Sequence, residues 1–347
     1  MGAEGFIAGR AGALGGGAMK SVDIISPVFR EEASIDAFHE ALSSALAPLS
    51  TRYRFRIIYV LDPSPDNTEQ KLKQIADRDP RVVALVSARR FGHQAALIAG
   101  IDYSDADAIV MLDSDLQHPP ALIPEMIARW EEGAEIVQTL RRDGAETAVA
   151  KRTTSRWFYD LLKRTSSIGL EPGAADFRLL TRAVADRFKT EIREHNPFLR
   201  GLVSWVGHRI VYLPFTPAKR FGGRSNYSAS ALFSFAVNGL CSFSKLPLRL
   251  CIGAGLAIAA LSMIVGLITV GLYIAGDRSV PGWASLFTVT IFATGINLFF
   301  LGVIGEYVGL IFDEVKNRPR YLISHQHAQT AASDVSAQLR AQTKVDA

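Results

Sequence analysis

The sequence predicts an α/β fold: a doubly wound, mostly parallel sheet, followed by an interfacial amphipathic helix and a hairpin of two transmembrane helices. Three observations predict it. Short runs rich in β-branched residues alternate with helix-compatible segments in the first half of the 347-residue chain, acidic side chains follow several of these runs, and the strongly apolar residues gather near the end of the chain. Alternation of this kind is typical of parallel sheets whose connections are helices.

Five runs have the composition of buried strands, namely residues 22–28, 55–61, 82–86, 108–112 and 135–140. The first four are separated by helix-compatible segments at residues 31–47, 66–77 and 93–103. In open parallel sheets, ligands bind outside the carboxyl ends of the strands. We therefore expect one functional site where the first, second, fourth and fifth strands end.

Two long apolar stretches, residues 246–274 and 283–312, follow the α/β region. The first contains a single charged residue, Arg249, and the second contains only Glu306. Each stretch exceeds the roughly 20 apolar residues that cross a bilayer. The link between them, residues 275–282, is too short for a folded element, so we expect a tight transmembrane hairpin.

Basic residues flank the outer ends of this hairpin. Arg278 alone lies in the link, whereas the outer ends carry Lys245, Arg249, Lys316, Arg318 and Arg320. The positive-inside rule therefore places both outer ends in the cytoplasm. The large N-terminal region and both termini are then expected to be cytosolic.

The composition argues against several other classes of site. The only two cysteines, Cys241 and Cys251, lie beside or inside the first apolar stretch, so neither a structural disulfide nor a cysteine metal site is expected. The net charge is +4, and basic residues gather near the predicted membrane surface. They are expected to contact anionic lipid headgroups or phosphates, and no nucleic-acid partner is predicted.

The chain divides into five expected regions, residues 1–20, 21–224, 225–245, 246–312 and 313–347. The first is rich in glycine and alanine and is expected to be disordered; the second is a cytosolic α/β domain. The third combines bulky apolar side chains with Ser and Asn and is interpreted as an interfacial helix, with an ordinary packed helix as the alternative. The fourth is the hairpin. The fifth is a cytosolic tail, expected to be mobile after Ser324.

Asp113, Asp115 and Gln117 follow the fourth apolar run. Mg²⁺ typically takes one or two carboxylates together with phosphate oxygens of the substrate. An Asp-x-Asp pair alone is more often a solvated turn, but at the end of the fourth strand of a doubly wound sheet it predicts a site for Mg²⁺ or Mn²⁺. His93 and His118 lie near this site without metal-ligand spacing, and a loop or packing role is expected for them.

The segment MLDSDLQHPP at residues 111–120 resembles the D-x-D-L-Q-x-P-P signature of the polyisoprenyl-phosphate glycosyltransferases, in family 2 of the GT-A superfamily. RFGHQAAL at residues 90–97 is similar to the N-F-G-x-Q-x-A segment of the same group, which includes the dolichol-phosphate mannose synthases. Three further motifs match in order, at residues 175–180, 198–207 and 220–227. The resemblance covers residues 21–323, including the hairpin.

Together with the strand ends, the resemblance implies individual roles at the donor site. The residues expected to contact the nucleotide-sugar are Pro27, Phe29, Glu31, Asp62, Asp113, Ser114 and Arg141, with Asp62 reading the base. The metal ligands that it implies are Asp113, Asp115 and Gln117. The chain departs from the family pattern at Leu61, which replaces the first acid of the nucleotide loop, and at Arg30, which stands where Asn is usual.

Asp176 and Arg178 match positions that the family uses in catalysis or near the phosphates. We expect Asp176 mainly to orient Arg178 or the sugar, because an acceptor phosphate with a second pKa of about 6 is largely deprotonated at neutral pH. The residues expected to bind the acceptor phosphate are Arg200, Arg220, Arg224, Ser225 and Tyr227. Asn226 replaces a Lys common in the family, with Arg224 as a candidate substitute.

The implied activity is the transfer of a single sugar, first choice glucose from UDP-glucose, to undecaprenyl phosphate in the bacterial cytoplasmic membrane, with inversion to a β-linked lipid phosphosugar. A GDP-mannose-dependent synthase acting on polyprenyl or dolichyl phosphate is the alternative enzyme, and a transport component for lipid-linked sugars is the alternative from another class. A processive synthase is not favoured, because the chain lacks the Q-x-x-R-W motif. The family also implies a homotetramer built through the hairpins.

Overall fold

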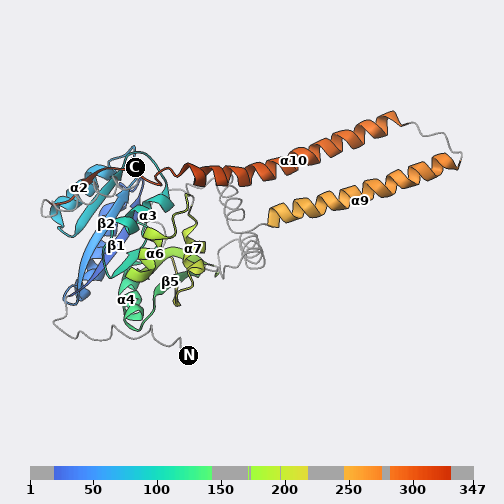
Figure 1. The fold of residues 1–347 in the computed structure, drawn as a ribbon. Helices are drawn as coiled ribbons and strands as arrows, with labels where there is room; N and C mark the ends of the chain where they lie inside the picture. The colour runs from blue at the N-terminus through green and yellow to red at the C-terminus, as the bar shows by residue number, and fades with distance from the viewer. Residues whose placement is uncertain are drawn as a thin grey trace, which may run out of the picture.

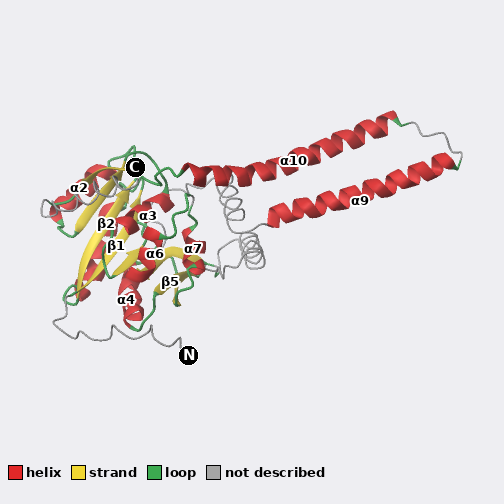
Figure 2. Cartoon of the chain, in the orientation of Figure 1, coloured by secondary structure: helices red, strands yellow, loops and turns green. Residues whose placement is uncertain are grey.

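The computed structural model describes residues 19–142, 171, 173–195, 197–217, 246–275 and 282–329. In this part of the chain an eight-stranded sheet with the order β7-β5-β6-β4-β1-β2-β3-β8 forms the centre of the α/β domain, from which two long helices extend (Figure 1, Figure 2). The expected interfacial helix at residues 225–245 lies outside the described residues, as does most of the expected N-terminal extension.

The strands are β1 (Lys20–Val28), β2 (Tyr53–Leu61), β3 (Val82–Ser87), β4 (Ala108–Met111), β5 (Ile136–Arg141), β6 (Ala174–Thr181), β7 (Ile210–Phe215) and β8 (Ile323–His327). Neighbouring strands are parallel, except that β6 is antiparallel to β4 and β5, and β8 is antiparallel to β3. The predicted mostly parallel sheet is therefore confirmed. The five predicted runs correspond to β1–β5, whereas β6, β7 and β8 were not predicted as strands.

Helices cover both faces of the sheet, as a doubly wound fold requires. One face packs against α1 (Ile35–Leu46), α2 (Thr68–Arg78) and α4 (Ile123–Glu131), and the other against α3 (His93–Tyr103), α6 (Arg182–Thr190) and α7 (Leu199–Trp205). Because successive side chains of a strand point to opposite faces, Ile24 of β1 joins the first core and Ile25 the second. α3 lies so close to β1 that any side chain at Gly100 would overlap Ile25.

The two helices that leave the domain, α9 (Leu246–Ile274) and α10 (Trp283–Lys316), lie side by side as a long hairpin (Figure 1). Both are long and apolar enough to cross a membrane, with mean hydropathies of 2.4 over Leu248–Ile268 and 1.8 over Val289–Lys316, and neither apolar window is buried in the structure. A core helix of a soluble domain would be mostly buried, so this exposure indicates membrane association.

α10 is longer than is needed to cross a bilayer. At 1.5 Å per residue its 34 residues extend about 51 Å, beyond the roughly 30 Å of a hydrocarbon core. The helix is therefore longer than such a layer is thick, and its carboxyl end lies next to the α/β domain (Figure 1).

Beyond α10 the chain returns to the sheet as what we call the C-terminal strap, residues 317–329. Asn317 ends the helix in the left-handed conformation, with φ of 45°. The Tyr321 hydroxyl donates to Asp102 Oδ2 at 2.9 Å, and the Ala88 amide donates to the Leu322 carbonyl at 2.8 Å. β8 then pairs along β3.

The expected mobility of the chain after Ser324 is therefore wrong for residues 324–327. β8 covers the edge of β3, whose backbone groups would otherwise be left open to pairing with another chain. A strand at the edge of a sheet is partly exposed to water, so polar side chains suit it. The composition of such a strand does not distinguish it from a coil.

Candidate active site

The carboxyl ends of β1, β2, β4 and β5 meet at one edge of the sheet, because these four strands run in the same direction. β6 runs the opposite way and therefore begins at that edge, which brings Asp176 to it. Met111 of β4 pairs with Arg178 of β6, and continuing this register by two residues places Asp113 opposite Asp176. The structure thus brings a predicted metal ligand next to a predicted catalytic residue.

Asp113 is held by two histidines. His93, the first residue of α3, has its Nε2 2.6 Å from Asp113 Oδ1, and the Asp113 amide donates to His118 Nδ1 at 3.1 Å. Desolvation opposes charge on both partners of the His93 pair. Even so, His93 and His118 hold the pKa of Asp113 below its usual value, and Asp113 raises the pKa of His93. Asp113 and His93 therefore favour each other's charged forms.

The pair of His93 with Asp113 was not predicted from the sequence. Twenty residues separate the two, and only the packing of α3 on the sheet brings them together. The signal available in the sequence was the position of His93 at the start of a helix that follows a parallel strand. His118 stacks on Phe177 with ring centroids 5.5 Å apart, which confirms the packing role expected for that histidine.

Asp176 lies between two arginines. Arg178 donates from Nη2 to Asp176 Oδ1 at 2.5 Å, and Arg200, on α7, donates from Nη2 to Oδ2 at 2.8 Å and from Nε to both oxygens at 3.2 Å. Desolvation would raise the pKa of Asp176, but Arg200 and Arg178 hold it well below its usual range. Burial lowers the pKa of Arg178 to about 10, so this guanidinium stays charged at neutral pH. Asp176 is therefore a weak proton acceptor and an anchor for both arginines.

Asp115 and Gln117 are partly exposed at the same edge of the sheet. The backbone amide of Gln117 donates to Asp115 Oδ1 at 3.0 Å. Ser114 is buried and donates to the Pro27 carbonyl at 3.1 Å, which joins the end of β4 to that of β1. Two carboxylates and a side-chain amide, all offering oxygen, suit a hard cation such as Mg²⁺ or Mn²⁺. The residues present fit the predicted metal.

Three of the predicted nucleotide-sugar contacts, Phe29, Glu31 and Asp62, lie on the loops that follow β1 and β2. The Phe29 ring lies against the guanidinium groups of Arg30 and Arg90, at 5.3 and 4.1 Å from its centroid. The Glu31 amide donates to Thr68 Oγ1 at 3.1 Å, which connects the loop after β1 to the start of α2. These contacts fix the two loops relative to each other.

Asp62, directly after β2, is only 4% exposed, and its carboxylate accepts hydrogen bonds from the backbone amides of Phe91 at 3.2 Å and Gly92 at 2.7 Å. It therefore holds the turn that leads into α3 and, with it, His93. The sequence did not indicate this structural role, and the base-reading role of Asp62 stays a prediction.

Arg141 ends β5 at the same edge of the sheet, where its side chain is exposed and its amide donates to the Gly173 carbonyl at 2.8 Å. Of the predicted acceptor residues, the structure places only Arg200 at the site. The others lie outside the described residues: Arg220, Arg224, Ser225 and Tyr227.

Comparison with known proteins gives consistent matches. Residues 23–188 match the family model described as glycosyl transferase family 2. The chain is 36% identical over 308 residues to the SfII prophage-derived bactoprenol glucosyl transferase of Shigella flexneri. This match covers 88% of this chain and 98% of that protein. It is 35% identical over 302 residues to the prophage bactoprenol glucosyl transferase homolog of Escherichia coli (strain K12), with 87% and 98% covered.

Among solved structures, the chain is similar to the mannosyltransferase PcManGT from Pyrobaculum calidifontis in complex with GDP-Man and Mn²⁺. The two are 16% identical, the TM-score is 0.44, and the match covers 85% of this chain and 86% of that one.

Proposed function

Because the chain belongs to glycosyltransferase family 2, we propose that it transfers one sugar from a nucleotide-sugar to a polyisoprenyl phosphate at the membrane surface. One observation carries this proposal: Asp113, Asp176, Arg178 and Arg200 gather at one sheet edge of a domain whose hairpin is apolar enough to cross a membrane. The relatives named as bactoprenol glucosyl transferases support a polyisoprenyl acceptor and make glucose the first choice of sugar.

In this proposal the donor lies on the loops after β1, β2 and β4, where the nucleotide contacts Phe29, Glu31 and Asp62. Asp113, Asp115 and Gln117 would hold Mg²⁺ or Mn²⁺, and the bound ion would supply the positive charge that the leaving diphosphate needs. His93 fixes the Asp113 carboxylate in place for this task.

The reaction is a single displacement. An oxygen of the lipid phosphate attacks the anomeric carbon, and the bond from that carbon to the nucleoside diphosphate breaks, leaving its electron pair on the diphosphate. In-line attack inverts the anomeric centre, so an α-linked donor gives a β-linked lipid phosphosugar. Because the acceptor phosphate, with a second pKa of about 6, is mostly deprotonated at neutral pH, the reaction needs no strong general base.

Of the two arginines beside Asp176, Arg200 offers the positive charge that a phosphate group requires. Guanidinium groups bind phosphate oxygens through paired N–H donors and keep their charge at all physiological pH values. Arg178 is fully buried and donates to Asp176 and to the carbonyls of Ala175 and Leu199, so it holds the Asp176 carboxylate in place. Arg200, on α7, is partly exposed and pairs with the same carboxylate. Asp176 then positions Arg200, the partly exposed arginine, toward the phosphates and does not itself remove a proton.

The basic residues at the outer ends of the hairpin support a cytoplasmic α/β domain with both termini on the same side of the bacterial cytoplasmic membrane. For the assembly, we propose the homotetramer built through the hairpins that the resemblance to the family implies.

The test uses the purified full-length chain in detergent with undecaprenyl phosphate, Mg²⁺ or Mn²⁺, and a panel of radiolabelled nucleotide-sugars that includes UDP-glucose and GDP-mannose. We expect a lipid-linked phosphosugar and an equal amount of nucleoside diphosphate with UDP-glucose, and neither after chelation of the metal. A product with GDP-mannose alone would change the choice of sugar. No product with any donor would overturn the proposal and favour a transport component.

A further inference from the structure

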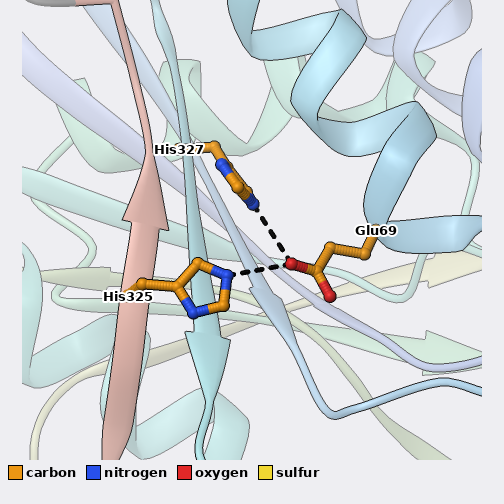
Figure 3. Close-up of side chains that lie close together, drawn as sticks. All are labelled: Glu69, His325 and His327. Carbon is orange, nitrogen blue, oxygen red and sulfur yellow. Dashed lines mark hydrogen bonds and ion pairs between the residues drawn. The ribbon is translucent and has the colours of Figure 1, made fainter.

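Two histidines and a glutamate come together where β8 and α2 meet, beside β3. His325 and His327 lie two residues apart on β8, so both project from the same face of that strand. Glu69, in the first turn of α2, reaches toward them from the helix (Figure 3). His325 Nε2 lies 2.9 Å and His327 Nε2 3.2 Å from the same oxygen, Glu69 Oε1.

The geometry of this cluster is that of a ligand set. The three ligand atoms all lie within 4.8 Å of one another, and the two imidazole rings are nearly perpendicular, with centroids 5.0 Å apart. Both rings direct Nε2 at one carboxylate oxygen, so positive charge in the space between the three side chains is favourable. A cation bound by the two Nε2 atoms and the carboxylate would place its charge there.

The chemistry of the donors selects the ion. Two imidazole nitrogens and one carboxylate suit Zn²⁺ and its neighbours Co²⁺ and Ni²⁺, whereas Mg²⁺ prefers oxygen ligands alone. We propose that Glu69, His325 and His327 bind one borderline transition-metal ion of this class. With three protein ligands, a water molecule completes the coordination.

The position of the site indicates what the ion does. His325 and Glu69 are 256 residues apart in the sequence, so the ion joins the C-terminal strap to a helix of the first half of the chain. Glu69 follows Thr68, whose hydroxyl accepts the Glu31 amide. The ion therefore connects the C-terminal strap, and through it the end of α10, to α2, the helix that supports the loop after β1. It stabilises the folded chain because it binds the folded state in preference to the unfolded one.

The side chains are accessible to an ion from solution: His325 is 46% exposed, Glu69 43% and His327 21%. The chain also offers a matched control. His208 Nδ1 lies 3.0 Å from Glu135 Oε1, a single histidine–glutamate pair in the same domain.

The experiment titrates Co²⁺ into the metal-stripped full-length chain, purified without a polyhistidine tag and kept in excess Mg²⁺ so that the Asp113 site is occupied. Visible absorption of Co²⁺ with nitrogen ligands reports binding. The melting temperature with and without Zn²⁺ reports how much the bound ion stabilises the folded chain. We expect one Co²⁺ per chain. His325→Gln, His327→Gln and Glu69→Gln should each weaken it at least tenfold, while His208→Gln leaves it unchanged.

The three variants keep polar side chains of similar size, and their melting temperatures without metal show whether they fold. Zn²⁺ should raise the melting temperature of the wild type and of His208→Gln but not of the three cluster variants. Folded cluster variants that bind Co²⁺ as tightly as the wild type would overturn the proposal, and so would a wild type that shows no saturable Co²⁺ absorption. None of these readouts depends on transferase activity.

Discussion

Glu314, in the last turn of α10, accepts a hydrogen bond from the backbone amide of His195 at 2.7 Å. His195 belongs to the segment that leads into α7, the helix that carries Arg200. Arg320 adds a second attachment by donating to the Ile192 carbonyl at 3.2 Å. The end of the membrane hairpin is thus fastened to the part of the α/β domain that carries the proposed acceptor arginine.

This attachment predicts a selective effect of Glu314→Ala. The change should lower kcat/KM for the lipid acceptor while donor affinity stays the same, because it loosens the hairpin and leaves the donor loops untouched. Loss of a hydrogen bond to a charged group costs about 1.5–3 kcal/mol, so the decrease is expected to be about 10–100-fold at most. Initial rates with varied lipid phosphate and a nucleotide titration measure the two quantities.

The neighbouring Asp313→Ala is the control, since it removes a carboxylate from the same turn, and it should behave as the wild type. Equal losses in the two variants would contradict the role of the Glu314 contact. So would a loss of donor affinity in Glu314→Ala.

The contacts of Asp176 predict that Asp176→Asn keeps measurable turnover. Its carboxylate is a poor base between two arginines, so the loss should be smaller than the factor of about 10²–10⁴ that a positioned general base contributes. The variant should be less stable, because removing one partner of a buried ion pair costs about 3–5 kcal/mol and Arg178 is fully buried. Single-turnover rates and melting temperature measure both effects.

Asp115→Ala is the comparison for that experiment. It should lose metal-dependent donor binding and fold normally, since Asp115 is partly exposed. If Asp176→Asn were as inactive as Asp115→Ala while it stayed folded and kept its donor affinity, the positioning role of Asp176 would be wrong.

The sequence was sufficient for the parts of the site that are local. β1, β2 and β4 are apolar on both faces because helices cover both, and this composition identifies them without any tertiary information. Asp113 and Asp115 directly follow such a run, so their place at the sheet edge follows from the strand assignment alone.

The rest depends on contacts between distant segments. β6 contains Asp176 and Arg178, whose burial is tolerated only because they pair with each other and with Arg200, so the strand does not have an apolar pattern. β8 is polar because it lies at an edge. The ion pair of His93 with Asp113 depends on where α3 packs on the sheet, which spacing along the chain does not encode.

Arg200→Ala is expected to raise KM for the lipid phosphate with a smaller effect on donor affinity. Asp176 keeps its contact with Arg178 in this variant, so the carboxylate stays in place while the positive charge of Arg200 is lost. A charge-assisted hydrogen bond of about 1.5–3 kcal/mol corresponds to an increase of about 10–100-fold. Arg129→Ala, which removes a surface arginine paired with Glu132, should leave KM unchanged. An unchanged KM in Arg200→Ala would remove Arg200 from the acceptor site.

Asp79 stabilises the fold away from the active site. It accepts hydrogen bonds from Arg81 Nη2 at 2.6 Å and from the Arg81 amide at 2.9 Å, and His39 Nε2 lies 3.4 Å from its Oδ2. Desolvation would raise the pKa of Asp79, but Arg81 holds it below its usual value. The folded pKa is therefore lower than the unfolded value of about 3.9, so the stabilisation is fully present at neutral pH and is lost as the pH falls below about 4.

Asp79→Asn should lower the melting temperature at pH 7 by about 2–10 °C, from a loss of about 1–3 kcal/mol. The difference from the wild type should shrink as the pH falls through 4, because protonation then removes the same charge from the wild-type residue. Asp186→Asn is the control: Asp186 is 51% exposed and lies 3.7 Å from Arg182, so its loss should have little effect at either pH. A difference between Asp79→Asn and the wild type that widens in acid would show that the Asp79 carboxylate is not the stabilising group.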